Sequence, residues 1–250
     1  MFQEYSFEIC VGSLFACKVA EEANANRVEL CSALEIGGIT PSAGLIAEAR
    51  KILTNTKLHV LIRPRGGDFC YSASEVKTML SDIQQAKELG ADGVVIGALN
   101  PSNTIDISTT KKLVQAASGL SITFHRAFDC LSDLEKGLYT LMDLGANRVL
   151  TSGGEDSVEL GKENLKQLHS IAENRIKILA GGGVSETNIK EIADYTGIRE
   201  FHFSGRVQKK RAKEVVLPSN FDSFGFGSPL LKEVSPERVH SIMCALKRDS

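Results

Sequence analysis

The sequence predicts an α/β fold: a single (β/α)8 TIM barrel that spans residues 1–250 as one domain. Three observations favour this class. Short apolar runs alternate with longer amphipathic segments, the alternation occurs eight times, and one short motif recurs before every second run. Strict alternation indicates a parallel sheet with right-handed crossovers. Eight such units within 250 residues fit a closed barrel better than an open doubly wound sheet.

The expected strands are short apolar runs that begin after turn residues, and the expected helices are the longer segments between them. The strands are predicted at 6–10, 27–31, 58–62, 93–97, 120–125, 147–151, 176–180 and 200–204. The helices are predicted at 13–23, 42–53, 73–89, 107–117, 132–144, 158–172, 185–195 and 235–247.

A recurring motif supports the barrel and sets its register. Alanine followed by Asn or Asp occurs at 25–28, 91–94 and 146–149, with a weaker copy at 197–201. Each copy lies at the entrance to a predicted strand, where a small residue suits a helix end that turns into a strand. Repetition on every second strand is typical of a barrel built from repeated βαβα units.

The same register predicts which side chains face the barrel interior, because alternate residues of a barrel strand point inward. The expected inward set is Glu8, Cys10, Glu29, Cys31, Arg63, Thr123, His125, His202 and Ser204. A barrel interior normally holds Val, Ile and Leu, and buried charge is costly unless it is paired or functional. A charged upper interior therefore indicates a functional site.

Composition excludes several other functions. With 42% hydrophobic residues and a net charge of −2, the chain has no global field that would attract nucleic acid or a membrane surface. Its first residues lack a secretory signal, and no stretch approaches the roughly 18–20 apolar residues of a membrane span. The six cysteines form no Cys-x-x-Cys pair, so we expect reduced thiols and a cytoplasmic protein.

The segment between the last predicted strand and the last predicted helix is irregular. Residues 207–234 are rich in Gly, Ser, Phe and Lys. Long loops of this kind are usually lids, binding loops or disordered segments. We expect an extended loop over the barrel top, and a scaffold role with this loop as partner surface is a further, weaker hypothesis.

A charged loop follows the strand at 58–62. It contains Arg63, Arg65 and Asp68 together with Pro64 and two glycines, and Ser72 or Ser74 is expected as the N-cap of the next helix. Loops on rigid scaffolds often carry function. Surface salt bridges would explain the same residues, but the inward register of Arg63 favours a site.

Two further segments carry candidate functional groups at carboxyl ends of strands, where barrel enzymes place their chemistry. In 123–129, His125 could act as general acid or base, Asp129 or a glutamate could orient it, and Arg126 could bind an anion. A structural ion-pair network is the alternative. The glycine turn after the strand at 176–180 and the segment after 200–204 favour an anion site, although glycine triplets also form simple turns. The expected anion-binding residues are Gly182, Gly183, Ser204, Gly205 and Arg206.

A repeated Glu-x-Cys sequence places Glu8 and Cys10 on one strand and Glu29 and Cys31 on the next. Adjacent parallel strands could bring the two thiols together, and paired thiolates suit Cu(I) or Zn. Buried cysteine is, however, more often a small hydrophobe. The two glutamates with a histidine could instead hold a harder cation.

The chain resembles the CutC family, named for copper homeostasis. The resemblance is carried by 28–33, 37–42, 62–72, 86–95, 123–129 and 149–153, and the run from Arg63 to Ser72 is its most specific part. It implies a cytoplasmic (β/α)8 barrel, a homo-oligomer (dimer or tetramer) and copper binding. Cys10 and Cys31 match the cysteines proposed in the family as copper ligands.

Two functional hypotheses follow. In the first, the chain is a copper homeostasis protein that holds Cu(I) between Cys10 and Cys31. In the second, it is a TIM-barrel enzyme that acts on a small anionic or phosphorylated metabolite. Its candidate catalytic residues are Glu8, Glu29, Arg63, Arg65, Asp68, His125, Arg126 and Asp129. Whether the protein is an enzyme stays open from sequence.

Overall fold

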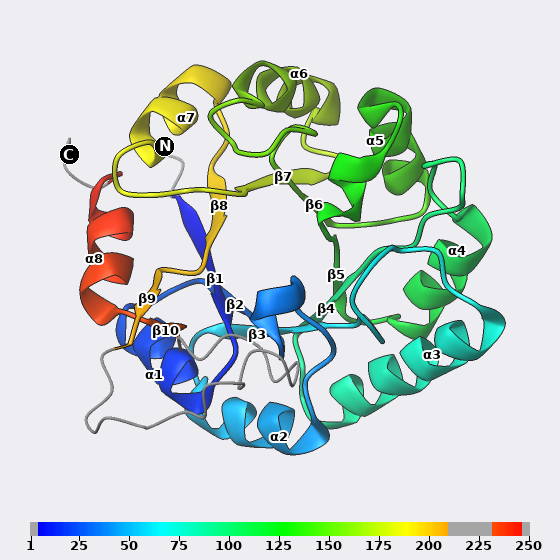
Figure 1. Ribbon diagram of the computed structural model, residues 1–250, viewed down its shortest axis with the longest axis horizontal. Helices are drawn as coiled ribbons and strands as arrows, with labels where there is room; N and C mark the ends of the chain where they lie inside the picture. Colours follow the sequence, from blue (N-terminus) through cyan, green and yellow to red (C-terminus); the bar gives the residue numbers. More distant parts are fainter. Residues whose placement is uncertain (1–4, 210–231, 247–250) are drawn as a thin grey trace, which may run out of the picture.

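The structure is a computed structural model that describes residues 5–209 and 232–246. Eight parallel strands form a closed barrel in which neighbours along the chain are neighbours in the sheet, and β8 pairs with β1. Figure 1 shows the strands as an inner ring and the helices as an outer ring. The predicted TIM barrel is confirmed.

The barrel strands are β1 (Ser6–Val11), β2 (Arg27–Leu30), β3 (Lys57–Leu61), β4 (Gly93–Ile96), β5 (Ser121–Phe124), β6 (Arg148–Thr151), β7 (Lys177–Gly181) and β8 (Glu200–Phe203). The helices are α1 (Leu14–Glu22), α2 (Ala43–Ile52), α3 (Ala73–Glu88), α4 (Ile107–Ala116), α5 (Leu134–Asp143), α6 (Lys162–Ala172), α7 (Ile189–Thr196) and α8 (Pro236–Cys244). Two 3₁₀ segments, η1 (Leu34–Ile36) and η2 (Arg126–Cys130), follow β2 and β5.

The strands are buried on both sides, but polar and apolar residues alternate in several of them, as in β2 (RVEL) and β8 (EFHF). Outward-facing residues such as Ile9, Val28 and Val60 pack against the helices in one large core cluster. Inward-facing Cys10, Cys31, Leu61 and Val95 form a separate cluster inside the barrel. The inner and outer faces of each strand therefore carry different chemistry.

Helices α6 and α7 begin later than the sequence predicts. Residues 153–161 form turns, and Gly161 lies so close to the Ser152 carbonyl that a Cβ atom there would overlap it. Ahead of α7, the Asn188 side chain accepts a 2.8 Å hydrogen bond from the Ser185 amide. The predicted start at 158 falls in a turn, and the one at 185 comes just before the turn 186–188 that leads into α7.

The segment 207–234, predicted to be an extended loop, forms β-strand at both of its ends. Strands β9 (Arg206–Gln208) and β10 (Lys232–Val234) pair antiparallel, and β10 lies beside α1. Residues 210–231 lie outside the described residues. Within the described ranges, no helix is long and apolar enough to span a membrane.

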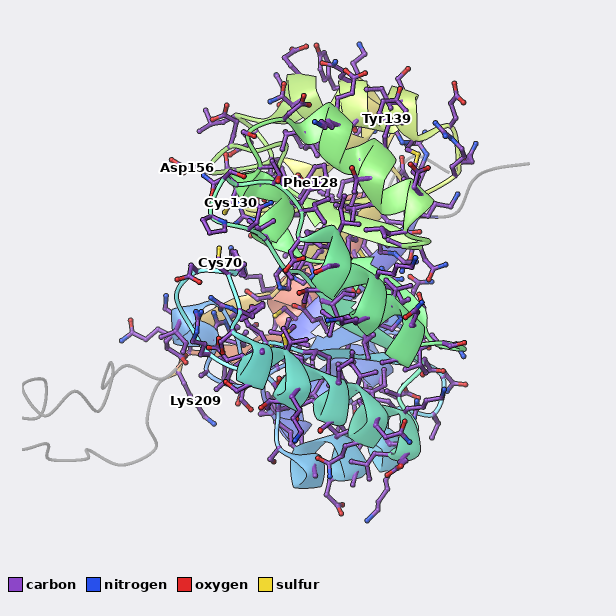
Figure 2. All side chains as sticks on the ribbon, turned by 90° about the vertical axis from the view of Figure 1, so that its right-hand side faces the viewer. Cys70, Phe128, Cys130, Tyr139, Asp156 and Lys209 are labelled. Atoms are coloured by element: carbon purple, nitrogen blue, oxygen red, sulfur yellow. The ribbon has the colours of Figure 1, made fainter. Side chains whose placement is uncertain are left out.

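The loops that follow the strands gather on one side of the barrel. Figure 2 shows Cys70, Cys130, Asp156 and Lys209 toward the left of the view; they follow β3, β5, β6 and β8. Tyr139 is on α5, in the outer layer. The carboxyl ends of the strands therefore meet at one face, where barrel enzymes place their sites.

Candidate functional site

A cavity of about 560 Å³ opens at the carboxyl ends of the strands. Its size lies within the usual range of about 300–1,000 Å³ for small-molecule sites. Its polar walls include Glu29, Arg63, His125 and His202, and Cys10 lies at the same surface. Apolar side chains, among them Phe69, complete the lining.

The two cysteines of the repeated Glu-x-Cys sequence meet at this cavity. Cys10 and Cys31 have their Sγ atoms 3.5 Å apart, and the Cys10 thiol donates to Glu29 Oε2 at 3.3 Å. The β1–β2 register places Cys10 opposite Glu29, which explains the contact. One donor atom from each of the three residues lies within 4.8 Å of the others. The hydrogen bond with Cys31, burial and the charge of Glu29 raise the pKa of the Cys10 thiol well above its ordinary value.

His202 joins this cluster to the charged layer beneath it. Its Nδ1 lies 2.7 Å from Glu8 Oε1, and its Nε2 lies 3.8 Å from Glu29 Oε2. Burial alone would lower the pKa of His202, but its hydrogen bonds and both carboxylates raise it well above the ordinary value. This raised pKa is consistent with a protonated His202, an imidazolium between the Glu8 and Glu29 carboxylates. Burial raises the pKa of Glu29.

Beneath His202, an ion network spans the barrel. Arg27 hydrogen-bonds Glu8, and it lies 3.2 Å from Glu200, which also pairs with Arg148 at 2.6 Å. Burial alone would raise the pKa of Glu8, but Arg27 and His202 lower it well below its ordinary value. Glu8 is completely buried and does not line the cavity, so its geometry is that of a structural ion pair.

The sequence interpretation missed Arg27, His59, Arg148 and Glu200 inside the barrel. His59 pairs in register with Glu29 and is 3% exposed. Burial lowers its pKa from 6.5 to about 3. His59 has the same inward parity as Leu61 and Arg63, but the otherwise apolar run 58–62 gives no sign of a polar role for it.

Arg63 and His125 meet at Phe69. The Arg63 guanidinium lies 5.0 Å from the Phe69 ring centroid, and the His125 and Phe69 ring centroids are 5.0 Å apart. Burial, with the nearby charge of Arg63, lowers the pKa of His125 from 6.5 to about 3. His125 Nδ1 accepts a hydrogen bond from the Ala127 amide, so the neutral ring carries its proton on Nε2.

Arg65 and Asp68 do not line the cavity. Arg65 bonds Asp68 at 3.0 Å and Glu75 at 2.5 Å, and the Asp68 side chain is 69% exposed. Glu75 also forms a capping box with Ser72 at the start of α3. These residues therefore brace the loop from outside, and only Arg63 of the charged loop turns inward.

Asp129 orients Arg126 rather than His125. Its carboxylate bonds Arg126 Nε at 2.7 Å and also accepts from the Ser152 amide and the Thr151 hydroxyl. Arg126 lies against Gly182, where a Cβ atom would be 3.3 Å from the guanidinium carbon. The predicted anion-binding residues all line the cavity together with Arg126: Gly182, Gly183, Ser204, Gly205 and Arg206.

Comparison with known proteins identifies the family. The model of the CutC family matches residues 5–207. A CutC family protein of Bacteroides fragilis is 54% identical to this chain over 212 residues. The match covers 85% of this chain and 84% of the relative. The chain belongs to the CutC family. The resemblance inferred from sequence motifs is thus confirmed.

Other similar proteins agree with this CutC assignment. A CutC protein of Pasteurella multocida is 47% identical over 199 residues, 80% of this chain and 81% of the relative. The crystal structure of a Streptococcus agalactiae CutC, named there for copper homeostasis, has a TM-score of 0.76 at 38% identity. That match covers 79% of this chain and 97% of the other. A Pyrococcus furiosus thiamine phosphate pyrophosphorylase, at 13% identity and TM-score 0.59, shares the barrel fold alone.

Proposed function

We propose that this CutC barrel is a copper homeostasis protein that binds Cu(I) between Cys10 and Cys31. The observation that carries the proposal is the 3.5 Å approach of the two thiols beside Glu29. Soft thiolates select Cu(I), while carboxylates suit harder ions. The naming of the Streptococcus agalactiae CutC for copper homeostasis supports the same assignment.

The surroundings of Cys10 suit a site that exchanges protons for metal. Because the Cys10 pKa is raised, the thiol is protonated without copper, and binding must release its proton. Glu29 Oε2, 3.3 Å from Cys10 Sγ, is the base positioned to accept it. Cys10 lines the cavity while Cys31 is completely buried, so copper would arrive from the cavity and reach Cys10 first.

A Cu(I) titration of the full chain under anaerobic conditions tests the proposal, with a competing chelator to measure affinity. The wild type should bind one ion, and Cys10→Ser/Cys31→Ser should lose that site. Cys130→Ser is the matched control, because Cys130 is an exposed thiol. Equal stoichiometry and affinity for the wild type and the double variant would refute the proposal.

The family resemblance also implies a cytoplasmic homo-oligomer, and we include both features in the proposal. A dimer or tetramer would be distinguished from a monomer by light scattering coupled to size exclusion. Neither feature enters the copper argument, which rests on residues of one chain.

A further inference from the structure

The cavity above the thiols carries far more positive than negative charge. Four arginines line it, Arg63, Arg126, Arg206 and Arg238, and Glu29 is the only carboxylate residue among the described lining residues. Three of these arginines have carboxylate neighbours within 4.0 Å: Arg126 with Asp129, Arg206 with Glu35 and Arg238 with Glu186. Arg63 differs, because it forms no ion pair within the described ranges.

Arg63 is a buried cation that has no counter-ion among the described residues. It is 6% exposed, and a buried charge that lacks a partner is costly. Its Nη1 donates to the Ile36 and Gly38 carbonyls, and its Nη2 donates to the Gly67 carbonyl, at 2.8–3.0 Å. These bonds fix the guanidinium in place but do not neutralise it.

The hydrogen bonds of Arg63 leave its Nε–H without a partner among the described residues, while the Tyr71 side chain lies close to the guanidinium. This Nε is buried, and the bonds to carbonyls account for only one of the two Nη2 protons. Nε–H and the adjacent Nη2–H form a parallel pair that matches two oxygens of a carboxylate or phosphate. A fixed guanidinium with an unpaired Nε–H can serve as a preformed anion anchor.

His125 offers a second unsatisfied donor near this anchor. It is 5% exposed and lines the cavity, and its Nε2 has no partner in the part of the chain that the structure describes. Because Nδ1 accepts from the Ala127 amide, Nε2 carries the proton and can only donate. Phe69 contacts both residues and fixes their relative position.

We propose that Arg63 and His125 together bind the acidic group of a small organic anion, a carboxylate or a phosphate, in the cavity above Cys10. The anion neutralises Arg63 and accepts from His125 Nε2. The remaining arginine wall, with Arg126 and Arg206, faces the rest of the molecule and favours a second acidic group. This site goes beyond copper binding and does not depend on it.

The neutral state of His125 also sets what it does in this site. With a proton on Nε2 and a backbone donor on Nδ1, it is a hydrogen-bond donor to the bound oxygen, not a base. This replaces the general-base role that the sequence suggested with a binding role. No covalent step is implied.

Isothermal titration of the metal-free full chain tests the site with four probes: acetate, succinate, inorganic phosphate and glycerol 3-phosphate. The two carboxylates and the two phosphates distinguish the acidic group that Arg63 prefers, and each pair compares a minimal anion with a larger one. We expect saturable binding of at least one probe. Failure of all four to bind the wild type would overturn the proposal.

Variants assign that binding to the two anchors. Arg63→Lys keeps the charge but removes the parallel pair of N–H donors, and it should weaken binding about ten-fold, which is about 1.4 kcal/mol. His125→Phe keeps a ring but removes the donor and should weaken binding similarly. If Arg63→Lys does not fold, the affinity of His125→Phe tests the proposal by itself. Arg175→Lys is the matched control and should bind as the wild type does, because Arg175 is exposed and does not line the cavity.

Unchanged affinity in both Arg63→Lys and His125→Phe would overturn the proposal. A Cu(I) titration of the same two variants separates this site from the copper site. It should match the wild type, because both residues are absent from the Cys10–Glu29–Cys31 cluster. Loss of anion binding with intact copper binding would therefore establish two distinct functions in one cavity.

Discussion

The three histidines inside the barrel are held in different charge states by their neighbours. His202 lies between two carboxylates, which raise its pKa. His59 and His125 are buried and form no ion pair within the part of the chain that the structure describes, and burial lowers the pKa of each to about 3. Identical side chains within one barrel interior therefore play opposite electrostatic roles.

The neutral state of His59 gives stability a pH dependence. Its pKa of about 3 in the folded protein lies below the ordinary 6.5, so the unfolded chain binds a proton more readily. Stability from this group is complete above pH 6.5 and is lost as the pH falls toward 3. Linkage gives a loss of about 2 kcal/mol between about pH 7 and pH 5.

Urea unfolding of the wild type and His59→Phe at these two pH values measures this contribution. The variant has no titrating group at the site, so its loss of stability on acidification should be about 2 kcal/mol smaller. For each protein, the stability at pH 5 is subtracted from the stability at pH 7. A loss of stability that the larger Phe ring causes equally at both pH values therefore cancels. Equal losses for the two proteins would show that His59 is not held neutral.

Parity along strands predicted much of the site at the level of single residues. Cys10, Glu29 and Cys31 could be placed together because side chains alternate along a strand. The outward turn of Arg65 could not be predicted, because it depends on the loop that joins β3 to α3. That loop follows no period, and its path is fixed by the bonds of Arg65 to Asp68 and Glu75.

At the scale of elements, β4 makes room for the histidines of its neighbours. A Cβ atom at Gly93 would lie 2.5 Å from His59 Nε2, and one at Gly97, just beyond β4, would lie 2.3 Å from His125 Cε1. Both glycines point inward, between β3 and β5. Imidazoles fit inside this barrel because the strand between them carries no side chain at those levels.

Replacement of Gly93 tests this packing. Gly93→Ala should destabilise the protein by about 1–3 kcal/mol, the usual cost of overpacking a core. Gly44→Ala is the matched control, because Gly44 lies in α2 and a Cβ atom there would meet only Ser42 Oγ, at an ordinary contact distance of 4.0 Å. That change should instead stabilise by about 0.5–1 kcal/mol. Thermal or urea unfolding measures both, and a neutral Gly93→Ala would contradict the packing argument.

Element boundaries were predictable where caps are local and less so where they are not. Ser72 or Ser74 was expected to cap a helix, and Ser72 does so, forming a capping box with Glu75 at α3. The late start of α6 depends on the contact of Gly161 with Ser152, which no local signal reveals. Helix periodicity alone therefore extended α6 into a turn.

At the scale of the whole molecule, the ion network helps to close the barrel. Arg27 of β2 bonds Glu8 of β1 and Glu200 of β8, and Arg148 of β6 bonds the same Glu200. Sequence parity identified Glu8 as buried, but its partners depend on the stagger between strands. That stagger appears only when the sheet is closed, so the network could not be read from the chain.

Removal of Glu8 tests how far the closed barrel depends on this network. Glu8→Gln leaves Arg27 with one carboxylate and His202 without its 2.7 Å partner, and breaking a buried pair in this way costs about 3–5 kcal/mol. Glu22→Gln is the matched control, because Glu22 pairs with Lys18 on the surface of α1 with both side chains about two-thirds exposed. Its cost should be about 0–1 kcal/mol.

Urea unfolding at neutral pH compares these two variants with the wild type. The slope of the transition shows whether unfolding stays cooperative, and its midpoint gives the change in stability. A large loss for Glu8→Gln would mean that the charges at the barrel floor hold β8, β1 and β2 together beneath the thiols. If Glu8→Gln were as stable as Glu22→Gln, closure would rest on backbone pairing and apolar packing alone.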